Sequence, residues 1–153
     1  MSEVRYTLVE GPGKGREYPT AATQYFHSLG GKFAYLSAGS LTLCGSANRP
    51  FGWIESQKNT SGKNSWVSAA TDEVFCYYAD DNNGFEIPAL ETAASLAASQ
   101  IGLSFNLVTR SATHAMIQYA LVGNTTASPL SVIDVDTDNH TVRVKVGPHF
   151  RQK

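Results

Sequence analysis

The chain has 153 residues, of which 42% are hydrophobic and 16% are charged, and its formal net charge is −1. The 12 basic and 13 acidic side chains are spread along the sequence, so no basic block indicates direct nucleic-acid binding. No apolar run reaches the ~18 residues of a membrane span, and the charged N-terminus lacks the apolar core of a secretory signal. We therefore expect one domain, or two small lobes sharing a core, made in a cytoplasm without a membrane partner. The sparse charge favours an assembled state.

Residues 1–28 are expected to form an extended N-terminal arm. The stretch GPGKGREYP contains three glycines and two prolines in nine residues, a composition that disfavours both helix and sheet. Its glycine spacing is not that of a phosphate-binding loop. Aromatic side chains on such an arm need a surface that buries them, on this chain or on a neighbour. We predict these aromatic residues to bind a partner, and they are Tyr6, Tyr18, Tyr25 and Phe26.

Residues 29–79 are predicted to form a β-rich lobe. Short apolar runs alternate with Gly and Asn turns at intervals of about ten residues, as in small barrels and sandwiches. Trp53 and Trp66 lie on either side of a polar hairpin tip, NTSGKN. We expect these indoles in the core or at a subunit contact rather than stacked on bases, because no cationic groove accompanies them. They therefore join the predicted partner-binding residues.

The two cysteines, Cys44 and Cys76, both lie in apolar runs. Such surroundings raise the pKa of a thiol and make it a poor nucleophile. We expect buried, reduced thiols, and a disulfide between the two remains open as an alternative.

The polar stretch DDNNG predicts a boundary, after which residues 85–150 form a second β-lobe or continue the first as one domain. Residues 89–100, ALETAASLAASQ, predict the one short α-helix, because they are rich in Ala and Leu and precede Gly102. Alternation on both sides of Asp138-Asn139-His140 predicts an antiparallel hairpin over residues 131–146. Its buried face is expected to hold Ile133, Val135, Val142, Val144 and Val146. The predicted fold class is mainly β, a small antiparallel barrel or sandwich with one short helix and an N-terminal arm.

The run Asp134, Asp136, Asp138 and Asn139 resembles the start of a calcium loop. An EF-hand requires glycine at its sixth position and a carboxylate at its twelfth, where this chain has Asn139 and Lys145. We therefore interpret Asp134 and Asp136 as the exposed face of a strand.

No other stretch of the sequence predicts a chemical site. The four histidines have no metal-ligand spacing, and no nucleophile motif is present. We expect no catalytic, metal or cofactor-binding residues and no enzymatic activity; the four histidines are His27, His114, His140 and His149.

Residues 85–152 carry a resemblance to a known family. The segments FEIPALETAASLAASQIGLSFNLV, AMIQYALV and SPLSVIDVDTDNHTVRVKVGPHFRQ resemble the capsid decoration proteins of tailed bacteriophages, also called cement or head-stabilisation proteins. The upstream segments FGWIES and NSWVSAATDEVFCYYA are similar to the same group, whereas residues 1–28 lie outside the resemblance.

The resemblance implies a non-enzymatic virion protein on the capsid exterior. Such a protein binds the major capsid protein as a homotrimer and bridges neighbouring capsid subunits. One alternative is a tail or baseplate component of the same kind of particle. Another is a carbohydrate-binding β-sandwich, whose platform would be formed by Trp53, Trp66 and Tyr77 or Tyr78.

Overall fold

The computed structural model describes residues 8–27, 31–44, 48–55, 65–70, 72–80, 82–92, 94–112, 115–123 and 129–147. Within these ranges the fold is mainly β, as the sequence predicts. The strands are β1 (Leu8–Glu10), β2 (Gly15–Pro19), β3 (Tyr25–His27), β4 (Lys32–Ser37), β5 (Ser40–Leu43), β6 (Gly52–Ile54), β7 (Ser65–Val67), β8 (Glu73–Tyr78), β9 (Gly84–Leu90), β10 (Ser104–Ala112), β11 (Ala115–Leu121), β12 (Leu130–Asp136) and β13 (Thr141–Val146).

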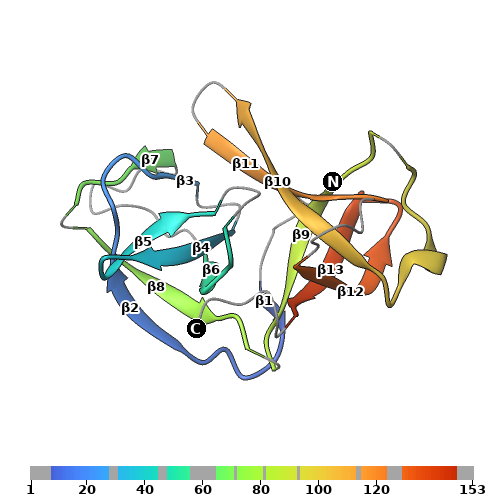
Figure 1. Ribbon diagram of the computed structural model, residues 1–153, viewed down its shortest axis with the longest axis horizontal. Helices are drawn as coiled ribbons and strands as arrows, with labels where there is room; N and C mark the ends of the chain where they lie inside the picture. The colour runs from blue at the N-terminus through green and yellow to red at the C-terminus, as the bar shows by residue number, and fades with distance from the viewer. Residues whose placement is uncertain are drawn as a thin grey trace.

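The strands of the second half of the chain close into a barrel. Their order is β9-β11-β10-β12-β13, and a further pairing of β13 with β9 completes the ring. The pairing of β9 with β11 is parallel, whereas the other pairings around the ring are antiparallel. β1 adds to the barrel by pairing with β9. The barrel occupies the right half of Figure 1.

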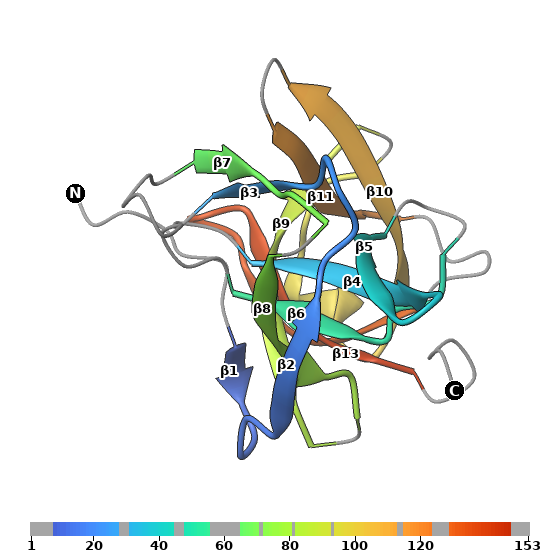
Figure 2. The same cartoon turned by 90° about the vertical axis from the view of Figure 1, so that its left-hand side faces the viewer.

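The first half of the chain forms a second sheet beside the barrel. Its order is β2-β8-β6-β4-β5, and a short separate pair is formed by β3 and β7. A single parallel bridge between Thr20 and Leu41 joins the two outer strands, so this sheet also curls back on itself. Figure 2 shows β2, β8, β6, β4 and β5 from the side opposite the barrel.

The two sheets share one hydrophobic core. Phe85 of the barrel stacks on Trp53 with ring centroids 5.0 Å apart and meets Phe33 edge-on at 5.5 Å. The barrel interior continues this cluster with buried aliphatic residues such as Leu107 and Val144. A second, smaller cluster around Phe26 fills the other face of the second sheet. The aromatic contacts therefore hold the sheet against the barrel.

A buried glutamine adds a polar link between the two sheets. Phe33 N donates to Gln118 Oε1 at 2.6 Å, and Gln118 Nε2 donates to the carbonyl oxygens of Phe33 at 2.8 Å and Cys44 at 3.1 Å. Gln118 lies on β11, whereas Phe33 lies on β4 and Cys44 directly follows β5. One amide thus satisfies three backbone groups across the junction, which fixes the register of β11 over the second sheet.

The predicted α-helix over residues 89–100 is wrong. β9 continues through Leu90, and only Ala98–Gln100 forms a short 3-10 turn, η1. Helix propensity is a weak preference, and a helix of about twelve residues is marginal in water without a face to bury. Here the first residues of the segment pair with β11, which satisfies their backbone groups in the barrel instead.

The predicted N-terminal arm is wrong for residues 8–27, because this part of the chain belongs to the sheets. β2 pairs along its full length with β8, and β3 pairs with β7. Gly11 and Gly13 fall in the turn between β1 and β2, where Gly11 has a φ of 96° and a Cβ atom would lie 2.1 Å from the Asn82 carbonyl oxygen. Pro19 ends β2 on an outer strand, where a proline is tolerated.

The predicted hairpin is confirmed as β12 and β13, but its buried face differs. The register shifts between Val132 and Asp134, which makes Ile133 the extra residue of a β-bulge. Leu130 and Val132 are therefore the buried side chains of β12, while Ile133 is half-buried and faces away from the main core. A strict period of two could not reveal this shift, because a bulge reverses the alternation.

Candidate functional site

A shallow acidic pocket of about 270 Å³ lies beside the β12–β13 turn. It is lined by the carboxylates of Glu86, Asp134, Asp136 and Asp138 and by the guanidinium of Arg143. Arg143 and Asp134 face each other in the hairpin register, and Arg143 Nε also lies 3.7 Å from Glu86 Oε1.

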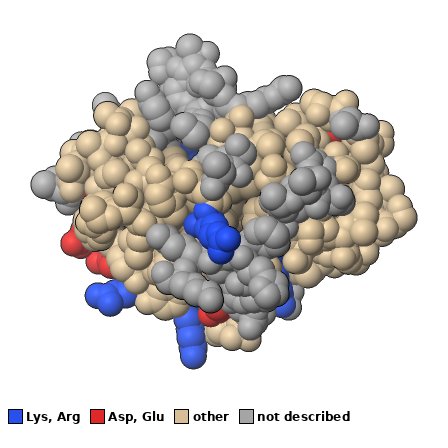
Figure 3. Space-filling view, in the orientation of Figure 1, with Lys and Arg blue, Asp and Glu red and all other residues tan. Residues whose placement is uncertain are grey.

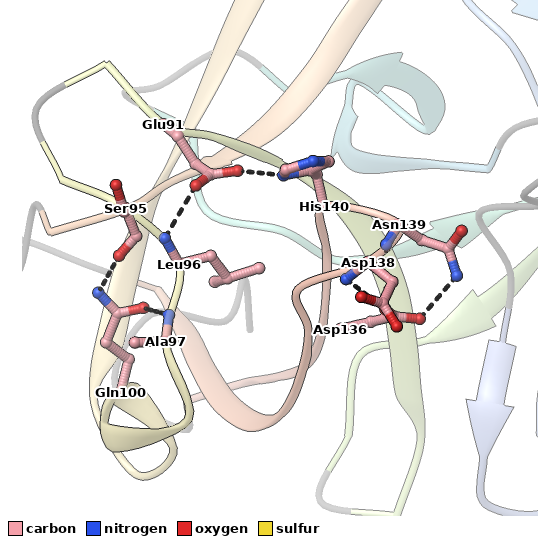
Figure 4. A network of polar contacts seen from close by, with 9 residues as sticks. All are labelled: Glu91, Ser95, Leu96, Ala97, Gln100, Asp136, Asp138, Asn139 and His140. Atoms are coloured by element: carbon pink, nitrogen blue, oxygen red, sulfur yellow. Dashed lines mark hydrogen bonds and ion pairs between the residues drawn. The ribbon is translucent and has the colours of Figure 1, made fainter.

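The turn uses the Asp136 carboxylate to hold its own backbone. Asp136 Oδ1 accepts hydrogen bonds from the backbone N–H groups of Asp138 at 3.1 Å and Asn139 at 3.0 Å. Its Oδ2 accepts one from Asn139 Nδ2 at 2.8 Å (Figure 4). These hydrogen bonds lower the pKa of Asp136, and the bond from the Asn139 side chain contributes most. Asp136 therefore acts as the cap of this turn.

A second polar network fastens the same turn to the loop after β9. His140, which has a φ of 56°, places its Nδ1 2.5 Å from Glu91 Oε1. The other carboxylate oxygen of Glu91 accepts a hydrogen bond from Leu96 N at 2.9 Å, and these two contacts lower the pKa of Glu91. Gln100 completes the loop with bonds to Ala97 N and the Ser95 carbonyl oxygen (Figure 4). Both networks are structural supports of the barrel end.

No group of three or more His, Cys, Asp or Glu side chains is arranged to hold a metal ion within the ranges that the structure describes. The acidic pocket fits this result, because Asp136 is engaged by its turn and Asp134 Oδ1 accepts a bond from Val135 N at 2.9 Å. His114 and His149 lie outside the described residues, as does the side chain of His27. In the described part, the DxDxDN run has the geometry of a hairpin turn.

Two of the predicted partner-binding residues are core residues. Trp53 is 0% exposed and Phe26 is 1% exposed, so neither ring reaches the surface. Gly31 makes room for the indole, since a Cβ atom there would lie 2.3 Å from Trp53. Trp53 therefore lies in the core, one of the two places predicted for it, and the predicted role in partner binding is wrong for Trp53 and Phe26 because both rings are buried. Trp53 likewise cannot form part of a sugar-binding platform.

Tyr18 is the predicted partner-binding residue that the structure places at the surface. Its half-buried ring meets Phe51 edge-on at 5.4 Å, and its hydroxyl lies 3.5 Å from that of Tyr78. The Arg16 guanidinium lies 5.3 Å above the ring. Burial and the Tyr78 hydroxyl raise the pKa of Tyr18. Tyr6 and the side chains of Tyr25 and Trp66 lie outside the described part of the chain.

Cys44 and Cys76 are buried, free thiols. Burial raises the pKa of the Cys76 thiol to about 12 and that of Cys44 further still. Neither thiol has the exposure or the low pKa that a nucleophile needs.

The sequence analysis missed an exposed aliphatic surface on the barrel. Ile101 is 46% exposed and Leu103 is 45% exposed, directly after η1. Their backbone is tied to β12, because Val132 N donates to the Leu103 carbonyl oxygen at 2.8 Å and Gly102 N donates to the Val132 carbonyl oxygen at 2.9 Å. We call Ile101 and Leu103 the aliphatic patch.

A sequence signal for this surface does exist. Among the 12 basic and 13 acidic residues of the chain, only Arg110 falls within residues 92–133. A segment of this length with a single charged residue indicates a surface that is not adapted to water alone.

Comparison of the chain with models of known protein families, with curated proteins and with solved structures finds no match. In the described ranges no helix has the length and apolar character needed to cross a bilayer.

Proposed function

We propose that this chain is a non-enzymatic virion structural protein that binds the outside of a tailed-phage capsid and bridges neighbouring capsid subunits. One observation carries the proposal. The longest segments that resemble capsid decoration proteins, within residues 85–152, span β9 to β13 and so cover the closed barrel. The two upstream segments, FGWIES and NSWVSAATDEVFCYYA, contain β6, β7 and β8. Residues of the barrel and of the upstream segments, such as Phe85 and Trp53, pack in one core, which supports a shared fold over this part of the chain.

The structure of the barrel suits a mechanical role. Ring closure leaves few free strand edges, and the polar networks of Glu91 and Asp136 fix the turn at one end. A rigid bridge loses little conformational entropy when it docks, so more of its contact free energy opposes separation of the shell subunits.

The test uses heads assembled without the protein. We expect the purified chain to co-sediment with such heads, to raise the temperature at which they rupture, and to add density to the shell in cryo-electron microscopy. Protein that stays in the supernatant of intact heads would contradict the proposal. Density confined to the tail would instead support the baseplate alternative.

A point substitution tests which residues contact the capsid better than a truncation of the N-terminal residues does. Removing residues 1–20 would delete β1 and β2, so loss of binding could reflect loss of the fold. Tyr18→Ala should weaken binding to heads roughly tenfold, the effect of removing one good anchor. Val67→Ser changes an exposed residue of β7, serves as the control, and should bind like wild type.

A further inference from the structure

The chain passes between the barrel and the second sheet at two places that lie together. The first passage leads from β1 to β2, and the second leads from β8 to β9. Both lie at the bottom of Figure 1. Their backbones come so close that a Cβ atom on Gly11 would lie 2.1 Å from the Asn82 carbonyl oxygen. We call the described residues of the two passages, 11–14, 79–80 and 82–83, the double crossing.

The side chain of Asn83 holds the double crossing together. Asn83 is 0% exposed, and its Oδ1 accepts a hydrogen bond from Gly13 N at 3.1 Å. Its Nδ2 donates to the carbonyl oxygens of Tyr78 at 2.9 Å and Lys14 at 3.5 Å. One buried amide therefore bonds the passage that leaves the barrel to the end of β8, from which the chain returns.

The residue after Asn83 makes this amide chemically vulnerable. Asn83 and Gly84 form the one Asn-Gly step of the chain. Glycine has no side chain to shield its nitrogen and leaves the backbone flexible, so in an open chain Gly84 N can attack the Asn83 Cγ atom. The bond from Cγ to Nδ2 breaks, ammonia leaves with the proton of Gly84 N, and a cyclic imide forms. Water then opens the imide at either carbonyl and gives aspartate or isoaspartate, and no atom is oxidised or reduced.

The folded chain opposes this reaction. The attack requires the amide to leave its three hydrogen-bond partners in a buried site and to turn towards Gly84 N. Gly84 is itself fixed in β9, where it pairs with Glu10. The Asp80 carboxylate also holds this turn, because its Oδ1 accepts bonds from Asn82 N and Asn83 N at 3.0 Å each. The reaction therefore requires the double crossing to open first.

We propose that Asn83 is a deamidation site that the fold keeps closed, that opening of the double crossing makes it reactive, and that its conversion weakens the attachment of the second sheet to the barrel. An aspartate has no N–H to donate to the Tyr78 and Lys14 carbonyl oxygens, and it sets a negative charge against both. An isoaspartate also adds a methylene group to the backbone before β9. A long-lived opening thus becomes a permanent loss of contact between the two sheets.

The first experiment follows residue 83 of the full chain in mildly alkaline buffer, with and without urea. Peptide mapping by mass spectrometry quantifies aspartate and isoaspartate. Ion exchange resolves the added negative charge, because the net charge is only −1 and most of the described surface in Figure 3 is uncharged. Conversion should be at least roughly a hundredfold faster in urea than in the folded chain.

Asn82 is the internal control for this rate, because it is exposed and is followed by Asn83 and not by glycine. It should convert slowly under both conditions. Equal rates at Asn83 in the folded and the unfolded chain would overturn the proposal. So would a rate at Asn83 in urea that is no faster than the rate at Asn82.

The second experiment opens the turn locally. Asp80→Ala removes the acceptor of two backbone N–H groups in the double crossing and should raise the rate at Asn83 in the folded chain about tenfold. Asp136→Ala is the matched control, because it removes a carboxylate that holds two backbone N–H groups of the β12–β13 turn, and it should leave the rate unchanged. Equal acceleration in both variants would contradict a local opening.

The third experiment measures what the conversion does to the fold. Asn83→Asp should lower the melting temperature by roughly 5 °C or more, whereas Asn82→Asp adds the same charge at an exposed position and should melt close to wild type. If Asn83→Asp does not fold, wild type is held in urea for increasing times, and the fraction that refolds should fall in step with conversion of residue 83. A variant that melts like wild type, or refolding that is independent of conversion, would refute the structural effect.

Discussion

The barrel and the second sheet differ in how their strands close and in what fills their cores, although they lie side by side in one chain. The barrel closes by continuous pairing around five strands and is filled largely by aliphatic side chains. The second sheet is closed by the single bridge of Thr20 with Leu41, and its largest fully buried side chains, Phe33 and Trp53, pack on Phe85 of the barrel. The second sheet therefore depends on the barrel for its core more than the barrel depends on it.

The two regions also treat charge differently. At the barrel end, the carboxylates of Glu91 and Asp136 lie at or near the surface and are held by hydrogen bonds. The second sheet buries Lys32, which is 6% exposed, and the thiol of Cys76. We expect the barrel to respond to acid and the second sheet to alkali.

The largest expected effect comes from removing the indole that joins the two regions. Trp53→Ala should lower the free energy of unfolding by about 3–5 kcal/mol, because it leaves a cavity between the second sheet and Phe85. Urea denaturation followed by circular dichroism measures the loss. If the regions share one core, the variant unfolds in a single transition. Two separate transitions in wild type would contradict the shared core.

The next largest effect comes from the glutamine at the junction. Gln118→Leu removes the hydrogen-bond acceptor of Phe33 N and the donor to the Cys44 carbonyl oxygen, and each buried group left unpaired costs about 1–3 kcal/mol. The Phe33 carbonyl oxygen keeps its bond from Cys44 N. Gln100→Leu is the matched control, since it also removes an amide that bonds two backbone groups, but at a less buried position. Urea midpoints should fall further for Gln118→Leu, and equal losses would show that Gln118 is not a special link.

Lys32 should make the stability of the second sheet rise with pH. Burial lowers the pKa of Lys32 from 10.5 to about 8, so the folded state binds fewer protons than the unfolded state between these values. The free energy of unfolding should therefore increase as pH rises from about 8 towards 10.5, relative to Lys32→Met, in which this proton is absent. Urea midpoints of both proteins across this range measure the difference. A constant difference would contradict the shift.

These regions also differ in how far the sequence predicts them. The hairpin of β12 and β13 follows from alternation around an Asp/Asn turn, and the β-rich composition predicts the fold class. The bulge at Ile133, the burial of Trp53 and the pairing of residues 84–90 depend on contacts between distant strands, which local patterns do not contain.

The errors have a common physical cause. Residues 8–27 and 89–100 have local composition that favours a loop and a helix, respectively, but sheet pairing with distant strands outweighs preferences of this size. For the candidate site, the alternation places Asp134 and Asp136 on a strand, and the structure has both in β12. Local patterns do not reveal the aliphatic patch, because the exposure of Ile101 and Leu103 depends on how the turn after η1 lies against β12. The low charge of the surrounding segment, with Arg110 as the one charged residue of 92–133, is visible in the sequence.

The smallest expected effect is the response of the barrel end to acid. Hydrogen bonds from Leu96 N and His140 lower the pKa of Glu91 below its usual value of 4.5, so the ionised carboxylate stabilises the fold at neutral pH. This contribution is present above the unfolded value and is lost as pH falls through the folded one. Wild type should therefore exceed Glu91→Gln in urea midpoint at pH 7, and the difference should shrink below pH about 4.5. Because Glu91 and His140 lie at the surface, the pH-dependent change in urea midpoint for Glu91→Gln should be smaller than that for Lys32→Met. A larger change would mean that the stability of the barrel end depends on this ion pair more than on ring closure.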